Sequence, residues 1–337
     1  MNLKFKTLIV ATTALAFTSV EAMAVEWKVS LWGKRRAFTE HVEHLAKSVE
    51  EKTKGAFKIK LFYGGALSKS KANLDGISYG AFQMAQFCAG YHRDKNPTIT
   101  VLELPFLGVS TLEEEIAVSR AVYAHPAVQK DLARWKAKLL MPSPMPQYNV
   151  AGVGKAPEKV ADFKGIRIRA TGGIGNAFKA VGAVPTSMTA SEIYNAMDSG
   201  VVSAVAFAEH AHISYRTIDI SKWWTSNLNP GTVNCPVVVN TDAFNALSDE
   251  HKKALTDSIE PALAHYLKNY KVIQDEKFSA VLKDKNIKKV TFSDEDIASF
   301  KEKAAGPARD AWLKTMEKRG IPGKELYDLV ITTLKKK

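Results

Sequence analysis

Apolar and polar positions follow two periods along this chain, and these periods divide its first hundred residues into strands and helices. Residues 26–32 and 57–62 alternate with the period of two that is typical of strands, and residues 82–87 form a third strand-like run. Residues 37–52 carry apolar side chains at helical spacing, and residues 70–78 form another predicted helix. The alternation of strands and helices predicts a mostly parallel sheet covered by helices on both faces.

The rest of the chain continues this mixture of strands and helices. Further strands are predicted over residues 165–169, 236–240 and 289–292, and further helices over residues 112–123, 127–138, 175–181, 191–197, 249–270, 308–318 and 323–335. Three prolines at positions 142, 144 and 146 exclude a regular helix there. We interpret residues 142–152 as a crossover between two lobes, with an irregular surface loop as the alternative.

The first 24 residues differ in pattern from the rest. Lys4 and Lys6 precede an apolar run over residues 8–20, and the small-residue segment 22–24 follows. This pattern predicts a secretory signal peptide, and its apolar core is shorter than the roughly 20 residues that cross a bilayer. The alternative is an amphipathic first helix. We expect cleavage after Ala24 and a protein located in the periplasm without a lipid anchor.

Length and charge restrict the possible classes of protein. The chain left after cleavage exceeds the size of about 250–300 residues at which single hydrophobic cores stop growing, so we expect two lobes. The formal net charge is +12, but the charges are scattered along helical faces without interleaved aromatic residues. This distribution favours a solvated surface over a nucleic-acid interface.

One arginine stands at a position suited to binding an acid. The strand predicted over residues 165–169 ends at Arg169, directly before the turn Thr171-Gly172-Gly173. A guanidinium holds a carboxylate by two parallel hydrogen bonds. The alternative is a surface arginine paired with a carboxylate of the protein, and Arg167 is the better candidate for that role.

Several ordered motifs around Arg169 resemble those of one family. Residues 162–169 match the pattern D-x-K-G-x-K-x-R with Arg in place of the second Lys, residues 182–188 match G-A-x-P-x-x-M, and residues 191–197 match S-E-x-Y-x-A-[LM]. The order and spacing resemble the solute-binding proteins of tripartite ATP-independent periplasmic (TRAP) transporters. Further matches at residues 51–55 and 104–106 extend the resemblance over essentially the whole mature chain. It departs from the family pattern at Gly80-Ala81-Phe82-Gln83, where the usual acidic residue is missing.

The resemblance implies a fold and a mode of action. It implies a two-lobed α/β periplasmic binding protein that closes like a flytrap, with a sheet in each lobe, helices on both faces, and a shared crossover strand and helix. We expect the first lobe over residues 25–145 and 238–275, and the second over residues 146–237 and 276–337. The resemblance also implies a monomer without a cofactor or bound metal, which delivers an organic acid to the membrane subunits of a TRAP permease.

Pocket residues follow from the resemblance, position by position. Arg169 corresponds to the arginine that clamps the ligand carboxylate, and Trp32 to a ligand-contacting residue that is often polar. Cys88 stands where the sialic acid-binding branch carries a glutamate, Asn149 where that branch has a second arginine, and Phe207 where the family has an asparagine. For Trp32 and Phe207 the alternative is a purely structural place in the core.

These departures bear on the substrate. A pocket with aromatic residues and a cysteine in place of charged groups offers few partners to a sugar acid or to a second carboxylate. Thr232, together with Tyr148, Asn149 and Asn234, could supply a few hydrogen bonds. We therefore expect a monocarboxylate with an apolar or aromatic body.

Other chemistry is weakly indicated. The glycines of residues 171–175 lack the spacing of a dinucleotide-binding loop, and we assign His41 and His44 to a polar helix face rather than to a metal. His210 and His212 are predicted at the surface, with the cleft as the alternative.

The chain has two cysteines, Cys88 and Cys235. We interpret Cys88 and Cys235 as small buried side chains without a bond between them, and a disulfide is the alternative.

The rival functions are an ABC-type binding protein, a ligand-presenting periplasmic sensor and a periplasmic enzyme. No nucleophile, base or metal set lies near Arg169 at a recognisable spacing, so we do not expect an enzyme.

Overall fold

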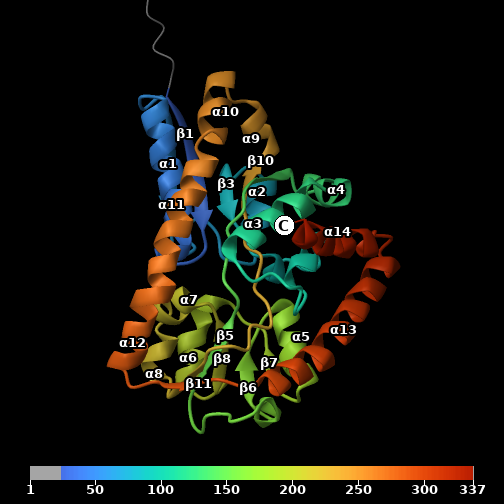
Figure 1. Ribbon diagram of the computed structural model, residues 1–337. Helices are drawn as coiled ribbons and strands as arrows, with labels where there is room; N and C mark the ends of the chain where they lie inside the picture. Colours follow the sequence, from blue (N-terminus) through green and yellow to red (C-terminus); the bar gives the residue numbers. More distant parts are fainter. Residues whose placement is uncertain (1–23, 337) are drawn as a thin grey trace, which may run out of the picture.

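The computed structural model describes residues 24–336, and it folds into two lobes that are each built around a mixed sheet (Figure 1). The first sheet has the strand order β2-β1-β3-β10-β4, and the second has the order β11-β9-β5-β8-β6-β7. The two-lobed α/β architecture expected from the sequence is therefore confirmed. The predicted signal peptide lies outside the described residues, apart from Ala24. Between residues 24 and 336, no helix has the length and apolar character needed to span a membrane.

The first lobe contains the sheet whose parallel strands the sequence predicted. Its strands are β1 (Val25–Leu31), β2 (Phe57–Phe62), β3 (Met84–Gln86), β4 (Ala137–Met141) and β10 (Val237–Asn240). Its helices are η1 (Ala37–Thr39), α1 (Glu40–Lys52), α2 (Asn73–Ser78), η2 (Ala89–Tyr91), η3 (Thr98–Glu103), α3 (Leu112–Ala124), α4 (Pro126–Ala133), α9 (Thr241–Asn245), α10 (Asp249–Thr256) and α11 (Ile259–Val272). Strand β1 pairs in parallel with β2 and β3, whereas β10 is antiparallel to both β3 and β4.

The second lobe contains the other sheet. Its strands are β5 (Asn149–Gly152), β6 (Arg167–Arg169), β7 (Val184–Thr186), β8 (Ala204–Phe207), β9 (Trp223–Thr225) and β11 (Lys288–Val290). The helices that follow or cover these strands are η4 (Val160–Phe163), α5 (Gly172–Ala180), η5 (Ala190–Glu192), α6 (Ile193–Asp198), α7 (Glu209–Ser214), α8 (Thr217–Ile220), η6 (Ile273–Lys277), α12 (Phe278–Asp284) and α13 (Asp294–Lys318). The last helix, α14 (Gly323–Lys335), packs against the first lobe.

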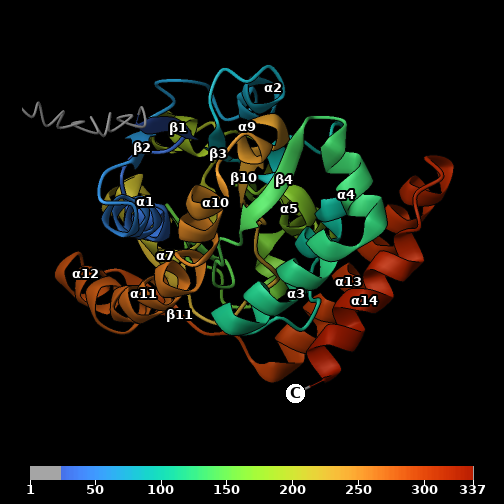
Figure 2. The same cartoon turned by 90° about the horizontal axis from the view of Figure 1, so that it is seen from above.

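The chain passes between the lobes several times. Residues 142–148 lead from β4 of the first sheet to β5 of the second, as the prolines predicted, and residues 226–236 lead back to β10. Helices α11 and α12 run along one side of both lobes, and α13 rises on the opposite side to α14, which packs on α3 (Figures 1 and 2). The domain boundaries given above stay a prediction.

The central strand β10 shows why the first lobe holds together. Val237 and Val239 pack into the layer formed with α1, α10 and α11, while Val238 packs into the layer on the other face of the sheet. All three side chains are fully buried. A strand buried on both faces has a continuous apolar sequence, which is the pattern that predicted β10.

Four predicted elements differ from the structure. The helix expected over residues 308–318 is the end of α13, which begins at Asp294. The helix expected over residues 127–138 ends at Ala133, because the backbone of Lys136 adopts a left-handed conformation and the chain then enters β4. The helix expected over residues 249–270 is divided into α10 and α11 at positions 257–258. Gly172 and Gly173 belong to the first turn of α5 rather than to a loop.

The two cysteines form a disulfide, which corrects the expectation of two unpaired side chains. Cys88 follows β3 and Cys235 precedes β10, and the pairing of Val237 with Gln86 continues to place the cysteines opposite each other. The sequence did not predict this bond because 147 residues separate the two positions. Only the return of β10 beside β3 brings them together.

Candidate functional site

A cavity lies where the two lobes meet, and both lobes supply its walls. The space between these walls, including the part that is open to solvent, is about 420 Å³. Its lining residues are Trp32, Arg36, Phe38, Cys88, Gly90, Tyr91, Glu103, Met145, Tyr148, Arg169, Thr171, Ala190, Phe207, His210, Ala211, Tyr215, Val233 and Cys235.

Arg169 reaches this cavity from the end of β6. Ile168 beside it is buried in the core of the second lobe. The strand ends at Arg169, shortly before α5 begins, so the arginine lies at the carboxyl end of the strand. Its Nε and Nη2 atoms donate to the carbonyl oxygen of Met188 at 3.2 and 3.1 Å, and Nη1 donates to that of Ala206 at 3.3 Å. Two backbone carbonyls thus fix the orientation of the guanidinium.

The charge of Arg169 has no acidic partner in the structure. The side chain is only 2% exposed, and no carboxylate within residues 24–336 lies at ion-pair distance from it. The face of its guanidinium lies over the ring of Phe207, with Cζ 4.5 Å from the ring centre. A buried cation is costly without a counter-charge, so this arrangement favours an anion in the cavity.

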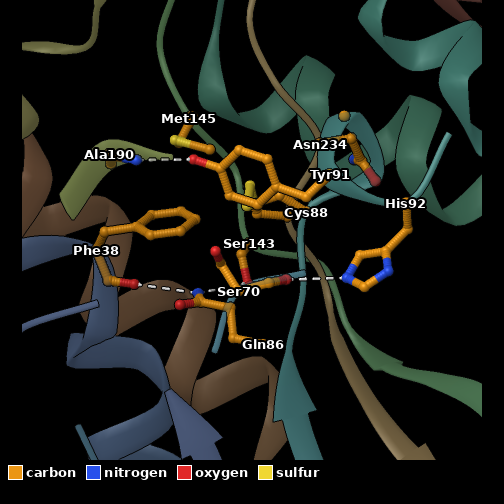
Figure 3. Close-up of a disulfide and its surroundings, with 12 residues drawn as sticks. Phe38, Ser70, Gln86, Cys88, Tyr91, His92, Ser143, Met145, Ala190 and Asn234 are labelled. Atoms are coloured by element: carbon orange, nitrogen blue, oxygen red, sulfur yellow. Dashed lines mark hydrogen bonds between the residues drawn. A yellow bond between two sulfur atoms is a disulfide. The ribbon is translucent and has the colours of Figure 1, made fainter. Parts of the chain in front are cut away.

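Tyr91 joins the first lobe to the arginine of the second. It ends η2, three residues after Cys88, and its hydroxyl accepts hydrogen bonds from Arg169 Nη2 at 3.3 Å and from the backbone nitrogen of Ala190 at 3.2 Å. Figure 3 shows the phenol extending from the disulfide towards Ala190. This hydroxyl is therefore a direct polar contact between the two lobes at the cavity.

Glu103 places a carboxyl group at the junction of the lobes. Its Oε1 accepts from the backbone nitrogens of Gly90 at 2.9 Å and Asn234 at 3.3 Å, and Oε2 has no partner in the described structure. Burial raises the pKa of this carboxyl to about 7, against a smaller opposite effect of Arg93. A Cβ atom on Gly173 would lie 1.8 Å from the Glu103 carbonyl oxygen, so only glycine permits this close approach of the lobes.

Aromatic side chains form much of the cavity wall. Phe207 stacks on Tyr215 with ring centres 5.8 Å apart, and it meets Tyr148 edge to face. Trp32 meets Tyr91 edge to face at 5.6 Å. Trp32 and Phe207 are packed in the core and also line the cavity, and their contact with a ligand stays a prediction.

A second arginine, Arg36, lines the cavity and was not predicted. Its Cζ lies 4.8 Å from the Trp32 ring centre, 5.4 Å from that of Phe38 and 5.5 Å from that of Tyr215. Only 9% of the residue is exposed. It stands in the basic run of residues 34–36, where the sequence offers no signal that separates a buried arginine from an exposed one.

The other predicted site residues lie at different distances from the cavity. Cys88 lines it as part of the disulfide. Asn149 does not line it, because its amide bonds to Thr225, Leu228 and Asn229 inside the second lobe. Thr232 is buried beside the lining residues, with its hydroxyl unpaired in the described structure. The predicted ligand contacts of Asn149 and Thr232 thus have no support from the cavity lining.

The histidines are more deeply buried than the sequence suggested. His210 and His212 are both buried, which corrects the surface assignment, and His210 lines the cavity. Burial lowers the pKa of His212 to about 3 and that of His210 well below its ordinary value. His41 is also buried, within 2.6 Å of the Ser143 hydroxyl, rather than on a polar face. These imidazoles are neutral at physiological pH and contribute packing and hydrogen bonds.

The family model for bacterial extracellular solute-binding protein, family 7, matches residues 29–315 of the chain. The 2,3-diketo-L-gulonate-binding periplasmic protein YiaO of Escherichia coli is 25% identical over 275 residues, which cover 79% of this chain and 80% of that protein. A monocarboxylate 2-oxoacid-binding periplasmic protein of Nostoc sp. is 25% identical over 290 residues, which cover 82% and 77% of the two chains.

Solved structures show the same fold. A TRAP solute-binding protein from a marine metagenome, specific for aromatic acids and bound to 3-hydroxybenzoate, superposes with a TM-score of 0.83 at 21% identity. The match covers 93% of this chain and 99% of that one. An extracytoplasmic solute receptor of Bordetella pertussis that binds pyroglutamic acid gives a TM-score of 0.78 at 21% identity, covering 91% and 99%.

Proposed function

The chain belongs to family 7 of the bacterial extracellular solute-binding proteins, and from this premise we propose that it captures a small organic acid and delivers it to a TRAP permease. Membership confirms the predicted resemblance and the predicted location outside the cytoplasm. The acid, its contacts and the permease are the proposed part. The predicted signal peptide is consistent with this role.

The observation that carries the proposal is the state of Arg169. Its guanidinium is buried at a cavity between the lobes, is held by the carbonyl oxygens of Met188 and Ala206, and has no acidic partner in the described structure. A carboxylate would supply the missing charge, and it could accept two parallel hydrogen bonds once the Tyr91 hydroxyl leaves Nη2. We propose that Arg169 is the carboxylate clamp.

The cavity wall favours one class of acid. Phe207, Tyr215 and Trp32 present rings to the space next to the clamp. A sugar acid would bury several hydroxyls among these rings without enough partners, at a cost of about 1–3 kcal/mol for each unpaired group. We therefore propose a monocarboxylate with an apolar or aromatic body.

Binding is proposed to close the two lobes. The ligand would contact Arg169 of the second lobe and Trp32 of the first, so only a closed protein satisfies all its groups and the population shifts to that state. The closed form would then dock on the permease. The proposed mechanism contains no chemical step.

A thermal-shift experiment with matched acids and amides tests the proposal. Benzoate, 3-hydroxybenzoate, pyroglutamate and 4-methyl-2-oxopentanoate would each be compared with the corresponding carboxamide. A ligand at 100 times its Kd adds about 2.7 kcal/mol to the stability, which raises the melting temperature by several degrees. Stabilisation by acids and not by amides is expected. Equal shifts with both, or no shift with any acid of a wider panel, would contradict the proposal.

A further inference from the structure

A group of unpaired polar atoms from both lobes lies beside the cavity. These are Arg36 Nε, Trp32 Nε1 and the hydroxyl of Tyr215, and none of them has a hydrogen-bond partner in the described structure. Each of the three residues is at least nine-tenths buried and lines the cavity. Buried donors are rarely left unpaired in proteins, since each costs about 1–3 kcal/mol.

Two stacked rings, those of Tyr215 and Phe207, lie between Arg36 and the carboxylate clamp Arg169. The guanidinium of Arg36 faces Tyr215, Tyr215 stacks on Phe207, and Phe207 lies under the guanidinium of Arg169. An arginine therefore stands at each end of this pair of rings. A planar ligand that lies against the edges of the two rings would have its carboxylate at Arg169 and its far end at Arg36.

The position of Arg36 is built into the backbone. Its Nη1 donates to the carbonyl oxygen of Lys34 at 2.9 Å, and the guanidinium passes over the Cα of Gly33. A Cβ atom at position 33 would lie 1.7 Å from Nη1. Its neighbour Arg35 has the opposite environment, since its side chain is 75% exposed and forms an ion pair with Glu43.

The surroundings of Arg36 indicate which group it would bind. Like Arg169, it has no carboxylate partner within residues 24–336, but three aromatic rings lie within 5.5 Å of its Cζ. Cation–π contacts with these rings compensate part of its charge. The other two unpaired groups, on Trp32 and Tyr215, are neutral. This environment suits a neutral oxygen better than a second carboxylate.

We propose that Arg36, with Trp32 and Tyr215, binds a neutral oxygen, either hydroxyl or carbonyl, at the end of the ligand opposite to its carboxylate. This inference rests on the proposed function and refines it. The ligand would be a planar monocarboxylate with an oxygen substituent on the far side of its apolar body. Arg36 would then determine specificity, while Arg169 would provide the general requirement for an acid.

Calorimetric titration with paired probes tests the inference. The probes are benzoate against 3-hydroxybenzoate, phenylacetate against 3-hydroxyphenylacetate, and isophthalate as the acid with a second carboxylate. In the parent protein, the hydroxyl should tighten binding by about tenfold or more in at least one pair, as expected for a hydrogen bond to a charged donor.

Three variants show whether Arg36 causes this preference. Arg36→Met should reduce the advantage of the hydroxylated acid over the unsubstituted acid to about twofold or less. Gly33→Ala should have the same effect, because its methyl group displaces the guanidinium without removing it. Arg35→Met is the matched control and should keep the full advantage. Thermal melts would verify that each variant is folded.

The outcomes separate the inference from the proposed function. A hydroxyl advantage that survives both Arg36→Met and Gly33→Ala would overturn the role of Arg36. No hydroxyl advantage in the parent, or tighter binding of isophthalate than of 3-hydroxybenzoate, would overturn the neutral-oxygen assignment while leaving the acid clamp intact. Failure of all five acids to bind would contradict the aromatic-acid proposal itself.

Discussion

Replacing Arg169 by alanine should remove ligand binding and leave the fold in place. The contacts of Arg169 indicate the size of the loss in affinity and of the change in stability. A buried bidentate contact between a guanidinium and a carboxylate contributes about 3 kcal/mol or more, so the affinity for the best acid should fall by more than about a hundredfold. Arg169→Lys should recover only part of this affinity, since an ammonium cannot form two parallel hydrogen bonds.

The cost to the fold should be small. The substitution leaves the carbonyl oxygens of Met188 and Ala206 without their donors, at about 1 kcal/mol each. It also removes a buried cation that forms no ion pair in the described structure, and this change offsets part of the loss. A shift of the melting temperature by a few degrees is expected for a protein of this size.

Titration calorimetry with the tightest acid of the panel measures the affinity, and a thermal melt without ligand measures the stability. Arg167→Ala is the matched control, because Arg167 lies two residues earlier on the same strand and is exposed. Its affinity should equal that of the parent. The clamp assignment would be refuted if Arg169→Ala bound the acid as tightly as the parent while Arg167→Ala behaved identically.

Three further predictions follow from the same site. Phe207→Asn should weaken an aromatic acid about tenfold through lost stacking, as measured by titration; a dicarboxylate or sialic acid as the best ligand of the parent would refute the apolar-pocket reasoning. Glu103→Gln should stabilise the ligand-free protein more at pH 8.5 than at pH 5, in denaturant titrations. Burial raises the pKa of Glu103 from its ordinary 4.5 to about 7, so the folded state binds more protons than the unfolded state. The stability of the parent therefore falls, by up to about 3 kcal/mol, as the pH rises from 4.5 to above 7. A stability difference between Glu103→Gln and the parent that does not depend on pH, like the one expected for exposed Glu113→Gln, would contradict this prediction. Saturating acid should reduce the radius of gyration in small-angle scattering, and an unchanged radius would exclude closure of the lobes.

Local patterns were sufficient for much of the fold and for the position of one arginine at the cavity. The position of Arg169 could be predicted because a short alternating strand ends there and small residues follow it. The apolar run of β10 predicted a strand buried on both faces for the same reason. In each case the signal lies within a few residues of the feature.

Features that depend on distant segments could not be predicted. Arg35 and Arg36 are equivalent in sequence, and only the fold buries one against three rings and pairs the other with Glu43. Strand β4 continues an apolar pattern that also fits the end of a helix, and its pairing with β10 decides between them. Tyr91 follows a predicted strand end, which is the one local signal that could have suggested it.

Because Cys88 and Cys235 form a disulfide, a binding experiment has to state whether this bond is oxidised or reduced in the protein used. The disulfide closes a loop of 147 residues that contains every strand of the second sheet except β11, and in the chain-entropy model such a closure stabilises the fold by roughly 5 kcal/mol. Its sulfur atoms belong to the cavity wall, and Tyr91 follows three residues later. Protein made in a reducing cytoplasm would therefore unfold more readily than protein that acquired this bond during export.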